Sequence, residues 1–225
     1  SEAPFKRIGF NESMEKYGSD KPDLRIDLVV EDITELVQGT EFAPFAEGNT
    51  VKALVVTDCD MTRKHIDKLC ADVEVQAGFK PYWFKVEADG SFAGGVAKFM
   101  TPHHDAVVEA LGLTPGTLIG IAAGKKSAAQ KTAGVMRKML GALVPGHMDK
   151  ERYEFCWVVD FPMYEIGEES GELEFCHNPF SMPGGGAETL RKAIAGEIDP
   201  LTITAQQYDL VCNGIELSSG AVRNH

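Results

Sequence analysis

The chain has 225 residues, of which 44% are hydrophobic and 25% are charged, so it is long enough to bury one large core or two modest ones. Acidic residues outnumber basic ones by 34 to 22, and the resulting net charge of -12 opposes non-specific binding of nucleic acid. The sequence contains no apolar run of the roughly 20 residues that a membrane span needs, no secretion signal and no Cys-x-x-Cys pair. We therefore expect a cytoplasmic protein that has no membrane contact and carries reduced thiols.

The first thirty residues are polar, and Gly18 and Pro22 argue against a regular helix through the segment that contains them. From about Val29 onward, strand and helix patterns alternate. The β-branched run at 50–57 predicts a buried strand, and Thr62 is suited to be the N-cap of the helix after it. The elements predicted next are a hairpin of 82–87 and 91–99, a helix from 101 to 112, a strand at 118–123 and a long helix at 125–143.

Together these elements predict the α+β class, with a mainly antiparallel sheet that has helices on one face. We place this domain at residues 28–148, between a segment at 1–27 and another at 149–225. In the last segment, a strand-like run at 155–165 is interrupted by Pro162 and pairs back with 172–176. A loop at 182–186, a short helix at 187–195 and extended chain at 208–225 complete it.

Three charged residues near the C-terminus, Asp209, Glu216 and Arg223, are spaced by seven residues each. In an unbroken strand an odd separation places side chains on opposite faces. All three can face one site only if the parity changes between them, for which a bulge at Gly214 or at 218–220 is a candidate. Asn213-Gly214 is equally a hairpin signal, so both local geometries stay open.

Three stretches resemble the bacterial-type aspartyl-tRNA synthetases, a class II family: YGSDKPDLR at 17–25, FCHNPFSMP at 175–183 and YDLVCNGIELSSGAVRNH at 208–225. Between them, residues 116–141 look like the end of the GAD domain, which is inserted in the bacterial enzyme and recurs in an archaeal tRNA-dependent amidotransferase subunit. The resemblance implies a GAD-type insertion domain flanked by partial segments of a class II catalytic core. It also implies a homodimeric parent enzyme that activates L-aspartate with ATP and transfers it to tRNA-Asp.

The resemblance further implies roles for four residues. Glu216 matches a residue that contacts ATP through its Mg²⁺, and Asp209 is a second candidate ligand of that metal. Arg223 matches the arginine that binds the aspartate side chain bidentately, and His177 matches a histidine of the same pocket. Without the resemblance, these residues would be interpreted as strand-end charges and a turn histidine. Many relatives carry a second histidine where this chain has Asn178, which leaves open whether the parent also charges tRNA-Asn.

Two further charged stretches have alternative interpretations. Asp20, Lys21 and Arg25 either contact the catalytic core or form an ion-paired hinge where the insertion leaves it, and we favour the hinge. The long helix is locally basic, which indicates a solvated face rather than contact with the tRNA acceptor end; its basic residues are Lys125, Lys126, Lys131, Arg137 and Lys138.

The sequence contains neither the family's motif 2 arginine, in its Phe-Arg-Asp-Glu context, nor the motif 3 block that ends in Gly-Leu-Asp-Arg. We therefore expect an internal fragment of the synthetase that holds no complete catalytic set, is inactive alone and has no bound cofactor. The alternative is a non-catalytic GAD-type binding module of a tRNA-dependent amidotransferase. Such a module would lack the flanking synthetase stretches, so the segment from Asp209 to Arg223 favours the ligase.

Overall fold

The computed structural model describes residues 2–167 and 170–224, and the chain divides into two compact units. The first unit comprises Ser1–Ser13, Asp20–Leu24 and Tyr153–His225, and the second comprises Met14–Ser19 and Arg25–Arg152. The central domain predicted at 28–148 falls inside the second unit. Within the described residues, no helix is long and apolar enough to span a membrane.

The second unit is built on a five-stranded antiparallel sheet with the order β2-β3-β6-β4-β5. Its strands are β2 (Val30–Asp32), β3 (Thr50–Val56), β4 (Tyr82–Val86), β5 (Phe92–Ala93) and β6 (Leu118–Gly124). The predicted strands at 50–57 and 118–123 are confirmed as β3 and β6, which pair along their whole length. Both strands are mainly apolar and are buried on both faces of the sheet, and Lys52 of β3 is the charged exception.

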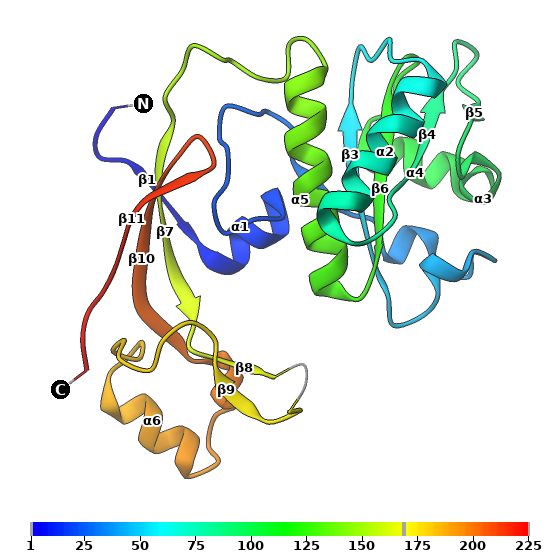
Figure 1. Ribbon diagram of the computed structural model, residues 1–225. Coiled ribbons are helices and arrows are strands. Elements are labelled where there is room, and N and C mark those ends of the chain that lie inside the picture. Colours follow the sequence, from blue (N-terminus) through cyan, green and yellow to red (C-terminus); the bar gives the residue numbers. More distant parts are fainter. Residues whose placement is uncertain (1, 168–169, 225) are drawn as a thin grey trace. The chain divides into compact units, whose positions relative to one another are not determined.

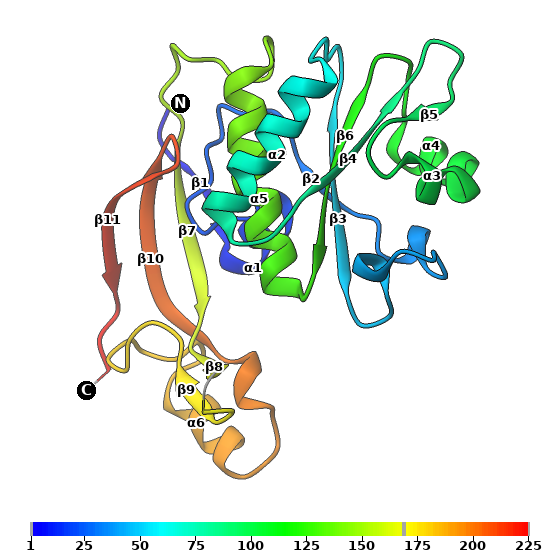
Figure 2. The same ribbon diagram turned by 45° about the vertical axis from the view of Figure 1, so that its right-hand side comes forward.

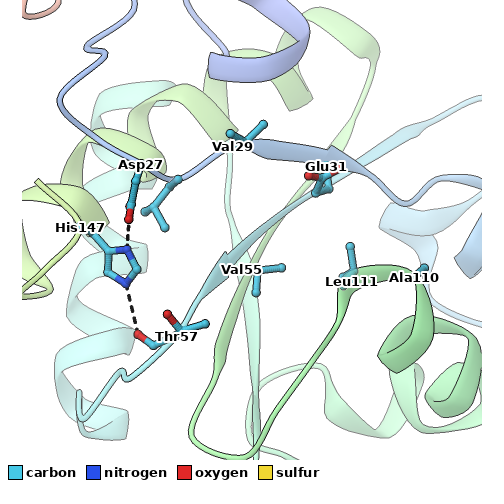
Figure 3. A pocket seen from close by; sticks show the side chains of 9 residues that line it. Asp27, Val29, Glu31, Val55, Thr57, Ala110, Leu111 and His147 are labelled. Carbon is cyan, nitrogen blue, oxygen red and sulfur yellow. Dashed lines mark hydrogen bonds and ion pairs between the residues drawn. The ribbon is translucent and has the colours of Figure 1, made fainter. Parts of the chain in front are cut away.

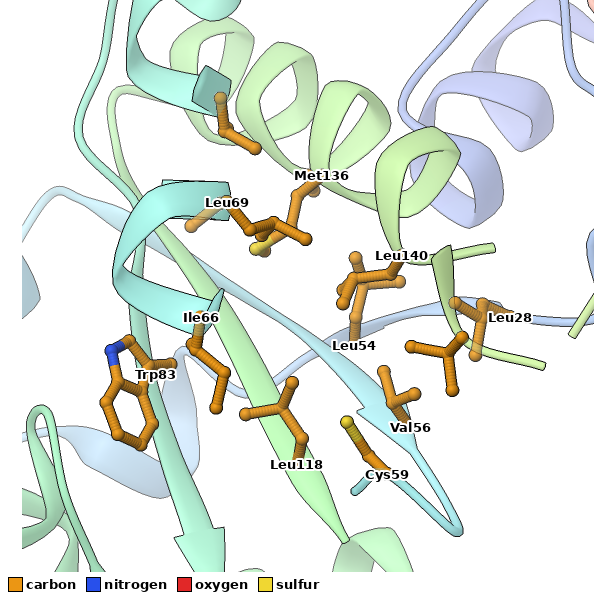
Figure 4. Packing of buried hydrophobic residues seen from close by; sticks show 14 of the residues in the cluster. Leu28, Leu54, Val56, Cys59, Ile66, Leu69, Trp83, Leu118, Met136 and Leu140 are labelled. Atoms are coloured by element: carbon orange, nitrogen blue, oxygen red, sulfur yellow. The ribbon is translucent and has the colours of Figure 1, made fainter. Parts of the chain in front are cut away.

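Helices α2 (Arg63–Ala77) and α5 (Lys126–Leu143) cover one face of this sheet (Figures 1 and 2). Figure 4 shows Leu69 of α2 and Met136 and Leu140 of α5 packed over the strand residues Leu54 and Leu118. A second buried cluster, on the other face, joins the strands to α3 (Ala97–Met100) and α4 (His104–Leu111). The prediction of helices on one face only is wrong, because alternate residues of β3 and β6 are apolar on both faces. Short 3₁₀ turns complete the unit: η1 (Glu35–Val37), η2 (Ala43–Phe45) and η3 (Thr101–His103).

The predicted helix boundaries agree with the structure where capping residues mark them. The Thr62 hydroxyl accepts a hydrogen bond from the His65 amide at 3.4 Å, and Gly112 ends α4 with a φ of 61°. In contrast, β5 ends well before the predicted limit of 91–99. The reason lies at Gly95, whose φ is 39° and where a Cβ would lie 1.8 Å from the Trp83 carbonyl oxygen, so the chain leaves the sheet there.

Two glycines let the end of α1 (Phe10–Tyr17) approach α5 within the second unit. A Cβ on Gly134 would lie 2.1 Å from the Gly18 carbonyl oxygen, and a Cβ on Gly18 would lie 2.4 Å from the Gln130 carbonyl oxygen. Both atoms belong to backbone, so neither clash can be relieved by turning a side chain.

We therefore expect Gly134→Ala to lower the free energy of unfolding by about 1–3 kcal/mol, as overpacking does. This loss would exceed the gain of about 1 kcal/mol that alanine brings to a helix interior. Urea denaturation of the isolated chain measures it. Gly9→Ala is the control, because nothing lies within 4 Å of a Cβ at Gly9. A Gly134→Ala variant as stable as the unsubstituted chain would contradict the close packing.

Two buried cations stabilise the second unit. Lys52 of β3 is 2% exposed and is paired with Glu15 and, at 2.9 Å, with Asp32. Burial lowers the pKa of Lys52, but the two carboxylates raise it by more, so the ammonium stays charged. Arg137 of α5 is 1% exposed and donates hydrogen bonds to backbone carbonyls, so the solvated face predicted for the basic residues is wrong at this position. The remaining four, Lys125, Lys126, Lys131 and Lys138, are exposed.

The first unit contains a four-stranded sheet with the order β1-β7-β10-β11. Its strands are β1 (Lys6–Gly9), β7 (Phe155–Pro162), β10 (Thr204–Cys212) and β11 (Ile215–Ala221), and only the β1–β7 pair is parallel. The predicted return of 172–176 onto the preceding run is confirmed by the pairing of β8 (Tyr164–Ile166) with β9 (Leu173–Phe175). The helix α6 (Ala187–Ile194) and the turn η4 (Pro200–Thr202) follow. Helices with mainly antiparallel sheets agree with the predicted α+β class.

Candidate functional site

The hairpin of β10 and β11 determines which C-terminal residues share a face. Asn213 and Gly214 have φ values of 53° and 79° and form the turn, so the hairpin alternative is the correct one. The pairing then shifts: Val211 lies opposite Glu216, but Leu210 lies opposite Ser218. Leu217 is therefore an extra residue in β11. The bulge exists, but at Leu217 and not at Gly214 or 218–220.

This bulge places two of the predicted residues on the same face of the sheet. Asp209 lies opposite Ser219, and Val211 lies opposite Glu216. Residues directly opposite each other share a face, as do residues two apart in one strand. Asp209, Ser219 and Glu216 consequently share one face, although seven residues separate the two carboxylates.

Lys21 brings a positive charge to these carboxylates from the N-terminal part of the first unit. Its Nζ lies 2.7 Å from Asp20 Oδ2 and 3.3 Å from Glu216 Oε2. Burial lowers the pKa of Lys21, and the carboxylates of Asp20 and Glu216 raise it by more, so its pKa is above the ordinary value. Both interpretations of this segment, the ion-paired hinge and the contact with the catalytic core, therefore apply to Lys21. Lys21 is ion-paired, as the hinge requires, and its partner is the candidate ATP-binding residue.

Asp209 is the most unusual acid of the site. It is 3% exposed, and its Oδ1 atom has no hydrogen-bond partner among the described residues. Burial raises the pKa of Asp209, the Glu216 and Asp20 carboxylates raise it further, and the Ser219 hydroxyl and Lys21 act against them, so the pKa stays above its usual value. Such a buried oxygen without a partner destabilises a fold and is most often kept for binding or catalysis.

The other two predicted residues lie around the loop at 176–183. The His177 ring packs edge-on against Phe161, with centroids 5.1 Å apart, and against Phe10 at 5.9 Å. The guanidinium of Arg223 lies 4.0 Å from the centroid of Phe180. Arg223 and His177 are both exposed. They belong to one neighbourhood, since the backbone of Arg223 pairs with that of the loop at Ser181.

Gln207 connects this neighbourhood to the carboxylates. Its Oε1 accepts a hydrogen bond of 3.2 Å from Asn178 Nδ2, and it lies two residues before Asp209 on β10. Two residues along a strand span roughly 7 Å, so the loop lies beside the part of β10 that carries Asp209. Nothing in the sequence pattern singled out Gln207. Lys21 could be singled out only as a member of the stretch YGSDKPDLR at 17–25.

A separate pocket lies in the second unit and includes none of the predicted residues. It has a volume of about 340 Å³, and Figure 3 shows His147 at its edge. The two ring nitrogens of His147 lie 2.8 Å from Asp27 Oδ1 and 3.2 Å from the Thr57 carbonyl oxygen. Because both nitrogens already have partners, this histidine has a structural role. Among the described residues, no group of three or more His, Cys, Asp or Glu side chains is arranged to hold a metal ion.

Comparison with known proteins gives a consistent family. The sequence model of the family "tRNA synthetases class II (D, K and N)" matches residues 1–225. The chain is 47% identical to the aspartate–tRNA ligase of Streptomyces avermitilis, over 99% of this chain and 37% of that protein. It is 45% identical to the aspartate–tRNA(Asp/Asn) ligase of Acidiphilium cryptum, over 99% of this chain and 37% of that protein. It is 41% identical to the aspartate–tRNA(Asp/Asn) ligase of Rickettsia felis, over 100% of this chain and 38% of that protein. The chain thus spans little more than a third of the length of these relatives, and it belongs to the class II tRNA synthetase family of the D, K and N type.

Proposed function

We propose that the chain is the part of an aspartate–tRNA ligase that carries residues of its ATP and aspartate sites. The proposed parent enzyme activates L-aspartate with ATP and transfers it to tRNA. The observation that carries the proposal is the Asp209–Glu216 pair beside Lys21, on the sheet face that leads to Arg223. The names of the relatives support aspartate as the amino acid.

The two carboxylates fit a magnesium ion that accompanies ATP. Mg²⁺ keeps several waters and is usually bound through one or two carboxylates and the substrate phosphates, so a full protein cage is not needed. Asp209 offers an oxygen that has no hydrogen-bond partner among the described residues. Glu216, on the same face, has a side chain that is 36% exposed. Asp209 and Glu216 would hold the ion, which when bound neutralises phosphate charge during attack by the aspartate carboxylate on the α-phosphate. The ion pair with Lys21 would hold the Glu216 carboxylate in place beside Asp209.

Arg223 is suited to recognise the side-chain carboxylate of aspartate. One face of its guanidinium is stacked on Phe180, which orients the plane but leaves the N–H groups at its edge free to donate. His177, fixed between Phe161 and Phe10, presents a ring nitrogen from the same loop. A carboxylate bound between them would meet one permanent positive charge and one ring N–H that can donate a hydrogen bond to it.

The remaining assignments are also proposals. The second unit is proposed to be a GAD-type insertion, and the parent to be a cytoplasmic homodimer that acts on tRNA-Asp. Relatives named for tRNA(Asp/Asn) and relatives without that label are similarly close, so tRNA-Asn is a second candidate substrate. The amidotransferase module is disfavoured, because the synthetase family model matches residues 1–225 and so includes the segments on both sides of the proposed insertion.

Arg223→Lys in the parent enzyme is expected to raise the KM for aspartate by about 10- to 150-fold, the equivalent of one charge-assisted hydrogen bond. The KM for ATP should change little. Aspartate-dependent ATP–pyrophosphate exchange measures both. Arg191→Lys is the matched control, since Arg191 is an exposed arginine of α6 paired with Glu188. Exchange should be absent from the isolated chain. An unchanged aspartate KM in Arg223→Lys would refute the role of Arg223, and exchange by the isolated chain would refute its proposed dependence on the rest of the enzyme.

A further inference from the structure

We infer that Asn178 and Gln207 are positioning residues that set the geometry of the proposed aspartate pocket, an inference that rests on the proposed function. The Asn178 side chain bridges two segments, its own loop and β10. Its Oδ1 accepts hydrogen bonds from the Ser181 amide at 3.0 Å and from the Ser181 hydroxyl at 2.6 Å. Its Nδ2 donates to Gln207 Oε1 at 3.2 Å. One amide side chain thus closes the loop on itself and joins it to β10.

Backbone hydrogen bonds also join the loop to the segments on either side of it. The Met182 amide donates to the Val222 carbonyl at 2.7 Å, and the Met182 carbonyl accepts from the Gln206 amide at 2.7 Å. The Asn224 amide donates to the Phe180 carbonyl at 3.0 Å. The loop therefore lies between the beginning of β10 and the chain that follows β11. Ser181, at the centre of this arrangement, is fully buried.

Both proposed aspartate-binding residues depend on this arrangement, although their own side chains are exposed. His177 directly precedes Asn178. Arg223 pairs through its backbone with Ser181 and stacks on Phe180, so both of its contacts are with the loop that Asn178 closes. A shift of the loop would consequently move both residues together and leave Asp209 and Glu216 in place on β10 and β11. The bridge should therefore affect aspartate binding and not ATP binding.

An amide is well suited to this position because it supplies a donor and an acceptor at once and does not titrate. Asn178 uses the acceptor for Ser181 and the donor for Gln207. The loop is therefore fixed without adding a charge beside Arg223, and Arg223 remains the main charge by which the pocket recognises a carboxylate.

The test compares variants of the parent enzyme in ATP–pyrophosphate exchange. Asn178→Ala should raise the KM for aspartate about tenfold, and Gln207→Met about threefold, with the KM for ATP within about twofold of the parent value. The double variant should match Asn178→Ala alone, because Gln207 acts through Asn178. Gln76→Met is the matched control. Gln76 is an exposed glutamine of α2 outside the first unit, so this variant's KM for aspartate should stay within about twofold.

A general loss of structure would raise both KM values and lower kcat together, and that result would overturn the inference. So would a double variant whose effect is the product of the two single effects. A second readout does not need activity. In the isolated chain, amide hydrogen exchange at Ser181 and Met182 should accelerate about tenfold in Asn178→Ala and less than about twofold in Gln76→Met. If the parent showed no aspartate-dependent exchange, the proposed ligase would fail, and unchanged amide exchange would separately refute the bridge.

Discussion

Replacing Asp209 by asparagine is expected to make the protein more stable and the parent enzyme about 100-fold less active. The loss of activity follows from removing one of the two carboxylates proposed to hold magnesium, a preorganised electrostatic contribution of that size. The gain in stability, about 1 kcal/mol, is the usual sign of a substitution that relieves a strained functional group. Asp209 is 3% exposed and has one oxygen without a partner among the described residues.

The gain should depend on pH in a defined direction. The folded protein binds a proton at Asp209 more tightly than the unfolded chain does, because its pKa is raised by burial first and then by Glu216 and Asp20. The ionised carboxylate therefore destabilises the protein increasingly as the pH rises from about 4, the ordinary pKa of an aspartate, through the raised folded pKa. The Asp209→Asn variant escapes this loss. Its advantage should be present at neutral pH and absent in acid, below both pKa values.

Thermal and urea unfolding of the isolated chain at several pH values measures the stability, and pyrophosphate exchange by the parent measures the activity. Asp60→Asn provides the control at an exposed aspartate, where neither quantity should change appreciably. An Asp209→Asn variant that is less stable at neutral pH would show that the carboxylate stabilises the fold. A fully active variant would remove Asp209 from the metal site.

Replacing Arg137 by methionine is expected to lower the free energy of unfolding by about 3–5 kcal/mol, the largest stability effect proposed for this chain. The Arg137 Nε donates to the Leu28 carbonyl at 2.6 Å and Nη2 donates to the Ile26 carbonyl at 2.7 Å, while the guanidinium lies 4.8 Å from the centroid of Tyr17. Methionine fills similar space but leaves both buried carbonyls without these donors. The side chain thus connects α5 to the segment that precedes β2.

Urea denaturation of the isolated chain tests this effect. Arg137→Lys should recover only part of the loss, because one ammonium cannot reproduce the planar fork. Lys138→Met, at the exposed neighbour on the same helix, should change stability by less than about 0.5 kcal/mol. Equal effects at Arg137 and Lys138 would contradict a structural role for the buried guanidinium.

Much of the second unit could be predicted from sequence, because its signals are local. Thr62 marks the start of α2, Gly112 marks the end of α4, and the β-branched run of β3 identifies a buried strand. The missed features depend on tertiary contacts. Arginine is usually a surface residue, but Arg137 is buried and donates hydrogen bonds to two carbonyls that are distant in the sequence. Likewise, α1 was missed because it is short and lies in a polar segment.

The candidate site likewise combines features that the sequence indicates with features that depend on tertiary contacts. Asp209, Glu216, His177 and Arg223 could be named from sequence only through the family resemblance, since spacing alone placed the charges on alternating faces. The bulge at Leu217, which brings Asp209 and Glu216 to one face, has no local signal, because it arises from the register between two strands. Lys21 and Gln207 reach the site from segments far away in the chain. Pairings of this kind follow from topology and cannot be derived from one-dimensional periodicity.

The amino-acid dependence of ATP–pyrophosphate exchange by the parent enzyme tests the central claim most directly. The family comprises D, K and N enzymes, so aspartate, lysine and asparagine should be compared as the only amino acid supplied. Arg223 leads us to expect exchange with aspartate at least about 10³-fold more efficient than with asparagine or lysine, because an unpaired guanidinium in the pocket penalises a side chain without a carboxylate. Comparable exchange with asparagine or lysine, or none with aspartate, would contradict the account.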